Sequence, residues 1–524
     1  MHRVETDVLV IGGGATGTGA LRDLAMRGFK AILVEQRDLT HGTTGRYHGL
    51  LHSGARYAVR DTATAAECIQ ENRILRRIML HCIEDTGGFF VVTPWDDADY
   101  APRFHDGCRK ADIPVEEVSI GDMLRREPQL NPGIVRCFRV PDGAADSFRA
   151  AECTVASARE HGAQAWTYHL VERLLVENGR VRGALCRDLF KDEAVTIHAG
   201  MVVNAGGAWA GQIAASAGLS VPVLCGKGTM AAINHRVLNT VVSRCRPASD
   251  GDIIVPAHTV AVIGTTDVKV EDADRYAIEP WEIRLLLEEG EKLLPGLKDM
   301  RILRAWAGVR PLYQTSPADG DRSVSRGHAL LDHSVRDGVA GILTIIGGKW
   351  TTHRLMAQDV VDRVCQLLDT VRACRTHLEP LPAHAGAATH HVLGMPLARV
   401  EQMGARRDLV CECELATRAD VEHVVGFGET RTIDDIRRDV RLGMGPCQGA
   451  FCTYRAAGIL HGLRRRHAGS SQTALHDFLN ERWKGLRPVA SGDQLRQLRL
   501  NELIYRDVLN VDRLPLPDMG ATLE

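Results

Sequence analysis

The chain has 524 residues, of which 44% are hydrophobic and 25% charged, and its net charge is -2. This composition is that of a soluble globular protein with two or three domains, and the small net charge argues against nucleic-acid binding. The 14 cysteines are too sparse for a disulfide scaffold, and the opening "MHRVETDVLVIGGG" carries no signal-peptide pattern, so we expect a reducing cytoplasm.

The first elements form a βαβ pattern. Residues 6–14, "TDVLVIGGG", predict a buried strand, and residues 15–28, "ATGTGALRDLAMRG", have helical spacing and end in glycine. Residues 30–38, "KAILVEQRD", predict a second strand. A strand, helix and strand in this order predict a parallel sheet with helices packed on it.

Two later segments repeat the junction of a strand with glycines. They are "MVVNAGGAWA" at residues 201–210 and "ILTIIGG" at residues 342–348, which is followed by a long helix. Three such junctions spread over the chain predict one sheet interrupted by insertions. Residues 100–150 mix proline, charge and short apolar runs, as an inserted domain would.

The turn after the first strand has the spacing of a dinucleotide-binding fingerprint. Gly12, Gly14 and Gly17 fit G-x-G-x-x-G, in which the glycines permit a tight turn, the approach of a pyrophosphate and close helix packing. Glu35, at the end of the second strand, can accept hydrogen bonds from ribose hydroxyls. The fingerprint alone fits FAD or NAD, and the two later glycine junctions favour the more extended FAD. A glycine-rich turn without a ligand is the less favoured interpretation.

Four cysteines near the C-terminus form the second motif. Cys411 and Cys413 are followed after 33 residues by Cys447 and Cys452 in a glycine-rich loop. Thiolates bind both iron–sulfur clusters and zinc, but zinc sites usually use C-x2-C pairs, so the pattern favours a [2Fe-2S] cluster. Zinc, or a vacant or disulfide-forming set, remains an alternative. The other ten cysteines are expected to be buried apolar residues.

Together these motifs resemble the FAD-dependent glycerol-3-phosphate dehydrogenases, and most closely the large catalytic (A) subunits of the anaerobic three-subunit enzymes. The similarity runs nearly end to end. It is carried by "VIGGGATGTGALRDLAMRG", "ILVEQRDLTHGTTGRYHGLLHSGARYAV", "RILRAWAGVRPL", "LTIIGGKWTTHRLMA", "LVCECE", "GMGPCQGAFC" and "FLNERWKG".

The resemblance implies an α/β, overall α+β, architecture with a Rossmann-like FAD domain of the D-amino-acid-oxidase type. An antiparallel-sheet substrate domain and a small [2Fe-2S] domain like bacterioferritin-associated ferredoxin complete the fold. We expect the FAD domain at 1–75, 150–225 and 336–372, the substrate domain at 76–149 and 226–335, a linker at 373–407, the cluster domain at 408–463 and a helical segment at 464–524.

The same resemblance implies oxidation of sn-glycerol 3-phosphate to dihydroxyacetone phosphate, which is the reaction of a quinone-linked glycerol-3-phosphate dehydrogenase (EC 1.1.5.3). Electrons would pass through FAD and the [2Fe-2S] cluster to a menaquinone-type acceptor in anaerobic respiration. Partner subunits B and C would hold the chain on the cytoplasmic face of the inner membrane, and FMN is expected in a partner. The C-terminal helices, with Trp483, are expected either to bind a partner or to pack on their own chain.

The family motifs also imply roles for individual residues. Hydroxyls and turns of the motifs are expected against the flavin, and arginines beside the substrate phosphate. The implied cofactor-binding residues are Gly12, Gly14, Gly17, Glu35, Thr43, Thr44, Gly45, Gly206, Gly348, Lys349 and Thr351. The implied substrate-binding residues are Arg56, Tyr57, Arg310 and Arg326, and the catalytic set is Arg310, Lys349 and His52.

The proton acceptor is left open by the sequence. His48, His52 and His353 lie in flavin-facing motifs, and each could instead be a neutral structural histidine. Arg310 is a further candidate in this family. Two other functions compete: a different flavin dehydrogenase with the same cluster module, for opines, amino acids or 2-hydroxy acids, and an iron–sulfur sensor with a vestigial flavin site.

Overall fold

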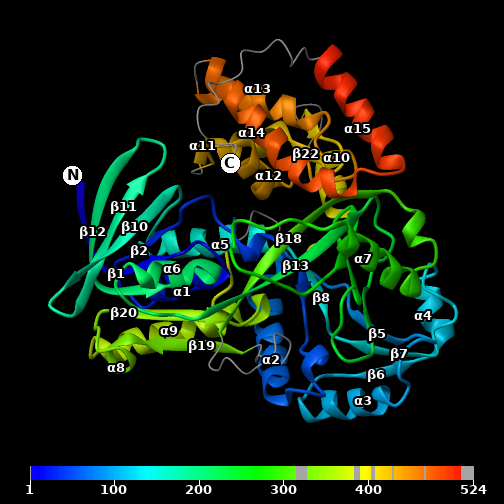
Figure 1. Ribbon diagram of the computed structural model, residues 1–524, viewed down its shortest axis with the longest axis horizontal. Coiled ribbons are helices and arrows are strands. Elements are labelled where there is room, and N and C mark those ends of the chain that lie inside the picture. Colours follow the sequence, from blue (N-terminus) through cyan, green and yellow to red (C-terminus); the bar gives the residue numbers. More distant parts are fainter. Residues whose placement is uncertain are drawn as a thin grey trace.

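A computed structural model describes residues 2–313, 327–382, 390–392, 394–402, 408–427, 430–464 and 468–508. Within these residues the chain forms two large mixed sheets and a mostly helical C-terminal part that lies against both (Figure 1). No helix in the described part of the chain is long and apolar enough to cross a bilayer.

The first sheet has eight strands among the described residues and forms the parallel core that the sequence predicted. Its path runs β10-β11-β12-β1-β2-β9, with β20 beside β12 and β19 beside β20. The strands are β1 (His2–Ile11), β2 (Ala31–Val34), β9 (Gln164–Trp166), β10 (His169–Glu177), β11 (Arg180–Asp188), β12 (Glu193–Asn204), β19 (His328–Asp332) and β20 (Ile342–Gly347). The helices packed with them are α1 (Ala15–Met26), α5 (Ser147–Glu160), α6 (Ala210–Ala215), α8 (His333–Arg336) and α9 (His353–Leu367).

The three predicted strand-to-glycine junctions meet at one edge of this sheet. β12 runs parallel to both β1 and β20, with Ile11 beside Asn204 and Asn204 beside Thr344. On the other side of β1, Ile11 pairs with Val34 of β2. The carboxyl ends of four parallel strands are therefore level, which is where ligands bind in sheets of this type.

The second sheet has nine strands in the described residues and collects both insertions. Its path is β17-β13-β16-β15-β14-β5-β7-β6, with β18 beside β13. The strands are β5 (Gly88–Val92), β6 (Glu116–Val118), β7 (Arg136–Val140), β13 (Val223–Ile233), β14 (Val241–Arg244), β15 (Ile253–Ala257), β16 (Val260–Gly264), β17 (Val268–Val270) and β18 (Ile302–Tyr313). The associated helices are α2 (Thr62–Ile78), α3 (Tyr100–Lys110), α4 (Ile120–Arg126) and α7 (Pro280–Leu293). β14 pairs with β5, β5 with β7 and β7 with β6, so the strands at 116–118 and 136–140 belong to the same sheet as β13–β18.

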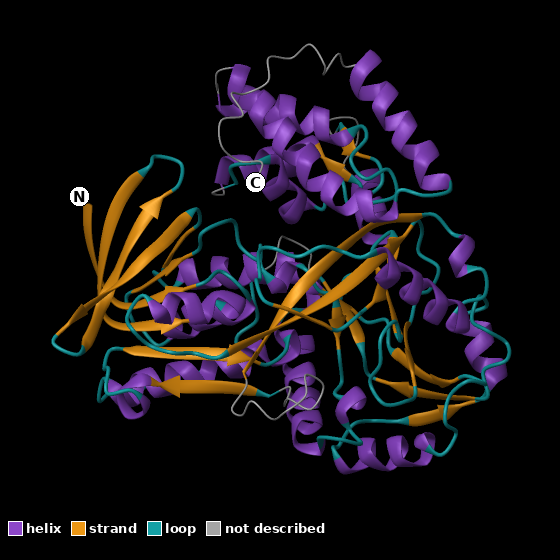
Figure 2. Cartoon of the chain, in the orientation of Figure 1, coloured by secondary structure: helices purple, strands orange, loops and turns teal. Residues whose placement is uncertain are grey.

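A small sheet and the C-terminal part complete the fold. The small sheet joins β3 (Leu50–Leu51), β4 (Ile83–Glu84) and β8 (Gly143–Ala145). Figure 2 shows that the C-terminal part is mostly helical, with one short strand pair. Its elements are α10 (Gly394–Gln402), β21 (Leu409–Cys411), β22 (Ala416–Thr417), α11 (Arg418–Phe427), α12 (Ile433–Val440), α13 (Cys452–Arg464), α14 (Ala468–Leu486) and α15 (Asp493–Leu503).

Part of the predicted linker lies against the first sheet's helices. The guanidinium of Arg22, on α1, donates to the carbonyl oxygens of Thr376 (3.3 Å) and Glu379 (2.7 Å), and Leu381 is buried. The beginning of this segment is therefore held to α1, on the first sheet.

Candidate flavin and iron–sulfur sites

The glycines after β1 are required by close backbone contacts. Gly12 has φ +111°, and a Cβ on it would lie 2.6 Å from the carbonyl oxygen of Ala205. A Cβ on Gly17, in α1, would lie 1.9 Å from the carbonyl oxygen of Gly12. Gly14 is the N-cap of α1, whose N-terminus favours an anion such as pyrophosphate. The turn thus has the properties that the fingerprint predicts.

Glu35 lies directly beside this turn. Its carboxylate accepts the N–H groups of Gly13 (2.7 Å) and Arg37 (2.9 Å), and burial raises its pKa. Because a carboxylate can accept about four hydrogen bonds, Glu35 retains capacity for ribose hydroxyls.

A cavity of about 550 Å³ begins at this turn and runs along the level strand ends. It is lined by predicted residues that follow β1, β2, β12 and β20, by residues between 43 and 57, and by one residue of β18. These residues are Gly12, Gly14, Glu35, Thr43, Thr44, His52, Tyr57, Gly206, Arg310, Gly348 and Lys349. Gly17, Gly45, Thr351 and Arg56 do not line it, and Arg326 lies outside the described residues.

The predicted residues that do not line the cavity support those that do. A Cβ on Gly45 would lie 2.3 Å from the carbonyl oxygen of Thr40, so glycine lets this segment close on itself. Thr351 Oγ1 accepts the backbone N–H of His52 at 3.3 Å. Arg56 donates to both carboxylate oxygens of Asp252, at 2.7 and 3.0 Å.

Two cationic side chains face the cavity. Arg310 donates to Asp267 at 2.9 Å and to Thr265 Oγ1 at 2.5 Å, which fixes its guanidinium. Lys349 follows the β20 turn, and its Nζ lies 4.8 Å from the centroid of the Tyr57 ring. A lysine and an arginine in one cavity can bind a phosphate dianion or stabilise negative charge on a reduced flavin.

The three candidate histidines differ in their hydrogen bonds. His48 Nδ1 accepts the N–H of Leu50 at 3.2 Å, and His353 Nδ1 lies 2.7 Å from the carbonyl oxygen of Trp350. Nδ1 of His52 is buried and has no hydrogen-bond partner among the described residues.

Burial lowers the pKa of all three histidines. The pKa of His48 falls to about 3 and that of His353 to about 4, while that of His52 lies well below its ordinary value. The charge of Lys349 adds to the effect at His52. At neutral pH His52 is therefore uncharged and has a nitrogen available to accept a proton.

Orphaned polar atoms indicate that the cavity is built for a polar ligand. Besides His52 Nδ1, the hydroxyl of Tyr47 is buried without a partner in the described residues. The Tyr47 ring stacks on Trp350 with centroids 6.0 Å apart and an interplanar angle of 20°. Unsatisfied buried groups are costly, so they argue for a bound partner with a planar ring system and polar edges. The sequence predicts no role for Tyr47, because variation is expected at this position of the "GTTGRYHG" motif.

The four predicted cysteines come together at the start of the C-terminal part. Cys411 and Cys452 are buried, and Cys413 and Cys447 are half-buried. Interactions with the thiols of Cys413 and Cys452 lower the pKa of Cys447. Backbone N–H groups of Gly449 and Ala450 also point at Cys447, and those of Glu414 and Gly443 at Cys411. Such N–H groups stabilise thiolates and tune iron–sulfur clusters.

The four sulfurs neighbour one another in pairs and do not form a compact three-ligand group. Among the described residues, only the group His81, Cys82 and Cys153 places three ligand atoms within 4.8 Å of one another. No three of the four predicted sulfurs therefore meet that condition, whereas one tetrahedral zinc would hold four sulfurs at about 2.3 Å from itself. Four cysteine thiols are the donor set that a [2Fe-2S] cluster uses, so the residues present fit that group.

A buried arginine lies beside these sulfurs. Arg482, on α14, is 5% exposed, and its Nε and Nη2 have no hydrogen-bond partner in the described part of the chain. Burial lowers its pKa, and Tyr505, Cys447 and Cys452 oppose that shift. Arg482 thus supplies positive charge next to a site that holds anionic thiolates.

The cysteine region is fixed to the rest of the chain by buried polar contacts. Tyr168 donates its hydroxyl to Asp435 at 2.6 Å, and Arg438 Nε donates to Asp38 at 2.9 Å. Near Cys413, Glu414 accepts the hydroxyl of Thr259 at 2.6 Å. These contacts hold the cysteine site in one position relative to both sheets.

Comparison with protein families identifies the same two parts. The FAD-dependent oxidoreductase family matches residues 7–360, and the BFD-like [2Fe-2S] binding domain matches residues 409–461. The fold also matches the glycerol-3-phosphate dehydrogenase from Bacillus halodurans complexed with FAD, with a TM-score of 0.58 at 19% identity over 99% of this chain and 97% of that one. Glycine oxidase from Geobacillus kaustophilus gives a TM-score of 0.56 at 21% identity, covering 74% of this chain and 100% of the other.

Three relatives match almost the whole chain, and all are A-type subunits of anaerobic glycerol-3-phosphate dehydrogenases. The A subunit of the Escherichia coli K12 enzyme is 41% identical over 97% of each chain. That of Haemophilus influenzae is 40% identical, covering 99% of this chain and 96% of its own. The A1 subunit of the Haloferax volcanii enzyme is 43% identical, covering 97% and 91%.

Proposed function

Because the chain belongs to the glycerol-3-phosphate dehydrogenase family, with the anaerobic A subunits, we propose that it oxidises sn-glycerol 3-phosphate to dihydroxyacetone phosphate. The observation that supports this most is the joining of a flavin cavity containing Arg310 and Lys349 to a four-cysteine site in one chain. When bound, FAD supplies a two-electron acceptor, and the [2Fe-2S] cluster supplies a one-electron carrier.

The nucleotide part of FAD is assigned to the β1 turn. Gly12, Gly14 and the α1 N-terminus would hold the pyrophosphate, and Glu35 the ribose. Thr43, Thr44, Gly206 and Gly348 would line the rest of the cofactor, with Tyr47 and Trp350 packed around its rings. Gly17, Gly45 and Thr351 would act indirectly, through the packing described above.

The substrate phosphate is assigned to the cationic end of the cavity. Arg310 would donate to phosphate oxygens, and its contact with Asp267 keeps the guanidinium oriented. Arg56 would contribute positive charge outside the cavity wall, where it is paired with Asp252. Tyr57 would position Lys349, whose ammonium group lies over the tyrosine ring. Arg326 belongs to the proposed substrate set on its place in the family motif alone.

His52 is the proposed base. The C2 hydroxyl of glycerol 3-phosphate gives its proton to the neutral His52 ring as C2 loses a hydride, which leaves a ketone. His52 is preferred because its buried Nδ1 has no partner in the described residues, whereas Nδ1 of His48 and Nδ1 of His353 each have one. Lys349 stabilises the negative charge that develops during the transfer.

The remaining assignments concern the complex. Relatives that are named as A subunits imply a multi-subunit enzyme. We extend this to partner subunits B and C, FMN in a partner, a menaquinone-type acceptor and a peripheral position on the inner membrane. The exposed Trp483 of α14 is a candidate contact for a partner. The predicted division into discontinuous FAD, substrate and cluster domains remains part of the proposal.

The test is a substrate comparison with the purified, FAD-loaded protein. We expect glycerol 3-phosphate to reduce an artificial dye, and sarcosine, octopine and 2-hydroxyglutarate not to do so. Dye reduction by an amine or 2-hydroxy acid in preference to glycerol 3-phosphate would establish the competing dehydrogenase function. A protein that binds the cluster but turns over none of these compounds would indicate the sensor.

A further inference from the structure

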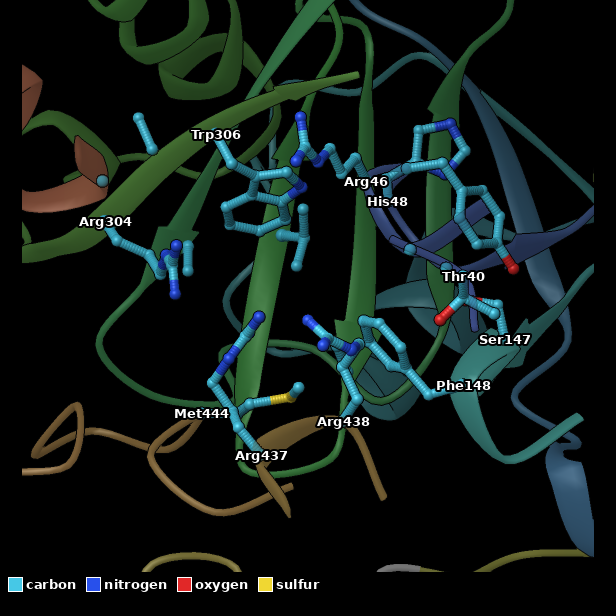
Figure 3. Close-up of a pocket in the computed structure, with 18 of the residues that line it drawn as sticks. Thr40, Arg46, His48, Ser147, Phe148, Arg304, Trp306, Arg437, Arg438 and Met444 are labelled. Atoms are coloured by element: carbon cyan, nitrogen blue, oxygen red, sulfur yellow. The ribbon is translucent and has the colours of Figure 1, made fainter. Parts of the chain in front are cut away.

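A second and larger cavity, of about 1100 Å³, lies where the two sheets and the C-terminal part meet (Figure 3). It meets the flavin cavity at His41, Tyr47 and His48, which line both. Most of its walls come from residues within 37–49, 144–149, 256–262, 304–307, 434–448 and 481–488, and residues within 81–84 and 274–280, with Ala232 and His391, complete them. A ligand in it would lie between the flavin cavity and the cysteine region.

The carboxylates that line this cavity all have partners. They are engaged in the pairs Glu84 with Arg236, Asp146 with Arg441, Asp274 with Trp209, Asp434 with Arg437, and Glu481 with Lys484, and Glu279 forms a capping box with Glu282. Four of these six carboxylates are therefore neutralised by a cationic side chain, while Asp274 and Glu279 hydrogen-bond to neutral groups.

Several arginines on the same walls are not balanced in this way. The guanidinium groups of Arg304 and Arg149 make no hydrogen bond or ion pair with any described residue. Arg46 contacts only neutral partners, the hydroxyl of Tyr276 and Nε2 of His41, both at 3.1 Å. The described walls carry nine arginine and lysine side chains against six carboxylates, so positive charge is in excess.

The titration of nearby groups agrees with this excess. The pKa of Arg304 is lowered to about 9 by burial and by the charges of Arg437 and Arg482, which outweigh the opposite effect of Asp434 and Glu481. The pKa of His41 falls to about 2 through burial and the charges of Arg438 and Arg46. Both lowered pKa values mean that neighbouring positive charge disfavours the protonated form of these side chains.

Aromatic side chains line the same hollow. Figure 3 shows Arg304, Arg437 and Arg438 extending toward it, with Trp306 and Phe148 on its walls. Arginine side chains bind phosphate with charge-assisted hydrogen bonds, and aromatic rings pack on planar bases. The cavity is at the upper end of the size range of small-molecule sites and far larger than glycerol 3-phosphate requires.

We propose that this cavity is a second binding site, for a phosphomonoester of mononucleotide size whose phosphate is bound by Arg304 and Arg46. Glycerol 3-phosphate carries the same phosphomonoester group and is the other possible source of that chemistry. The volume and the aromatic walls favour the mononucleotide.

The test uses the FAD-loaded, cluster-containing protein, in which the flavin cavity is filled. Binding of FMN, AMP and inorganic phosphate is measured by calorimetry, and KM for glycerol 3-phosphate by dye reduction. Arg304→Met removes the positive charge. Gly485→Ala keeps the charge but shifts the guanidinium, because a Cβ on Gly485 would lie 2.9 Å from Arg304 Nε. Arg496→Gln, which removes an exposed arginine of α15, is the matched control.

We expect FMN or AMP to bind the wild type. The affinity should fall by about tenfold or more in Arg304→Met, by a smaller factor in Gly485→Ala, and not at all in the control. A raised KM for glycerol 3-phosphate in Arg304→Met, with competition by inorganic phosphate, would instead identify the substrate as the phosphomonoester. Absence of binding by every probe, or equal binding to wild type and Arg304→Met, would overturn the proposal. Flavin reduction by substrate in the wild type tests the dehydrogenase function separately.

Discussion

The flavin cavity and the cysteine site are assembled in opposite ways. The cavity draws on residues from Gly12 to Lys349, which the level ends of β1, β12 and β20 bring together. The cysteine site is nearly local: its ligands lie between Cys411 and Cys452 and receive N–H groups from the same loops. A change in the cavity therefore acts on a junction of distant segments, whereas a change at a cysteine is expected to leave the flavin half intact.

The largest expected effect is the loss of turnover when the proposed base, His52, is replaced. His52→Gln should lower turnover by about 10²- to 10⁴-fold, because general-base catalysis contributes on that scale. FAD content should change little. His48→Gln is the matched variant, and an equal loss in both would contradict the assignment of the base to His52.

The pH dependence of the wild type sharpens the same point. The pKa of His52 in the folded protein lies well below its ordinary value, so the ring is deprotonated throughout the neutral range. We expect no loss of turnover from this group between about pH 6 and 8 and a loss only at lower pH. Its contribution to stability is present above the unfolded pKa of about 6.5 and declines as the pH falls toward the folded value. A turnover transition centred near pH 6.5 would count against a buried neutral histidine.

Lys349→Ala tests charge stabilisation in the cavity. Turnover should fall by about 10²- to 10³-fold, the scale seen when a preorganised stabilising group is removed. FAD occupancy, measured by absorbance, should fall much less. Lys191→Ala removes an exposed lysine as control, and equal losses of turnover and FAD in Lys349→Ala would show that the lysine only retains the cofactor.

Cys411→Ser should impair the cysteine site and leave the flavin cavity unaffected. Flavin reduction by glycerol 3-phosphate, followed by stopped-flow absorbance, should remain, while onward electron transfer should fall by about 100-fold or more, since even outer-shell changes at metal sites cost about 10- to 100-fold. Cys374→Ser changes a half-buried cysteine outside the set. Unchanged quinone reduction in Cys411→Ser would remove the cluster from the electron path.

Arg310→Lys should raise KM for glycerol 3-phosphate with a moderate loss of kcat. A lysine keeps the charge but loses the fork that contacts Asp267 and the phosphate together, so kcat/KM should fall by about 10- to 50-fold. Steady-state dye reduction measures this. A variant with normal KM would place the phosphate elsewhere in the cavity.

The smallest expected effect is on the cluster potential. Arg482→Met removes a buried positive charge beside Cys447 and Cys452, so the reduction potential should fall by about 50 mV, where 59 mV is tenfold for one electron. The flavin potential should not move. Redox titration followed by electron paramagnetic resonance measures both, and a raised cluster potential would contradict the role of this charge.

The sequence predicted those features that depend on local pattern. The βαβ opening and the glycine turns follow from periodicity and from backbone space, as the contacts of Gly12 and Gly17 show. The cysteine set was found from its spacing. Contacts between distant segments left no such signal: neither the burial of the Tyr47 hydroxyl nor the pairing of Arg438 with Asp38 can be read from neighbouring residues.

The most direct test is one absorption spectrum of anaerobically purified protein, recorded before and after glycerol 3-phosphate is added, with metal analysis of the same sample. We expect flavin and iron–sulfur absorbance, about two iron atoms per chain, and bleaching of the flavin by the substrate. Zinc in place of iron, or a flavin that the substrate does not bleach, would contradict the coupling of a glycerol-3-phosphate-oxidising flavin to an iron–sulfur cluster in this chain.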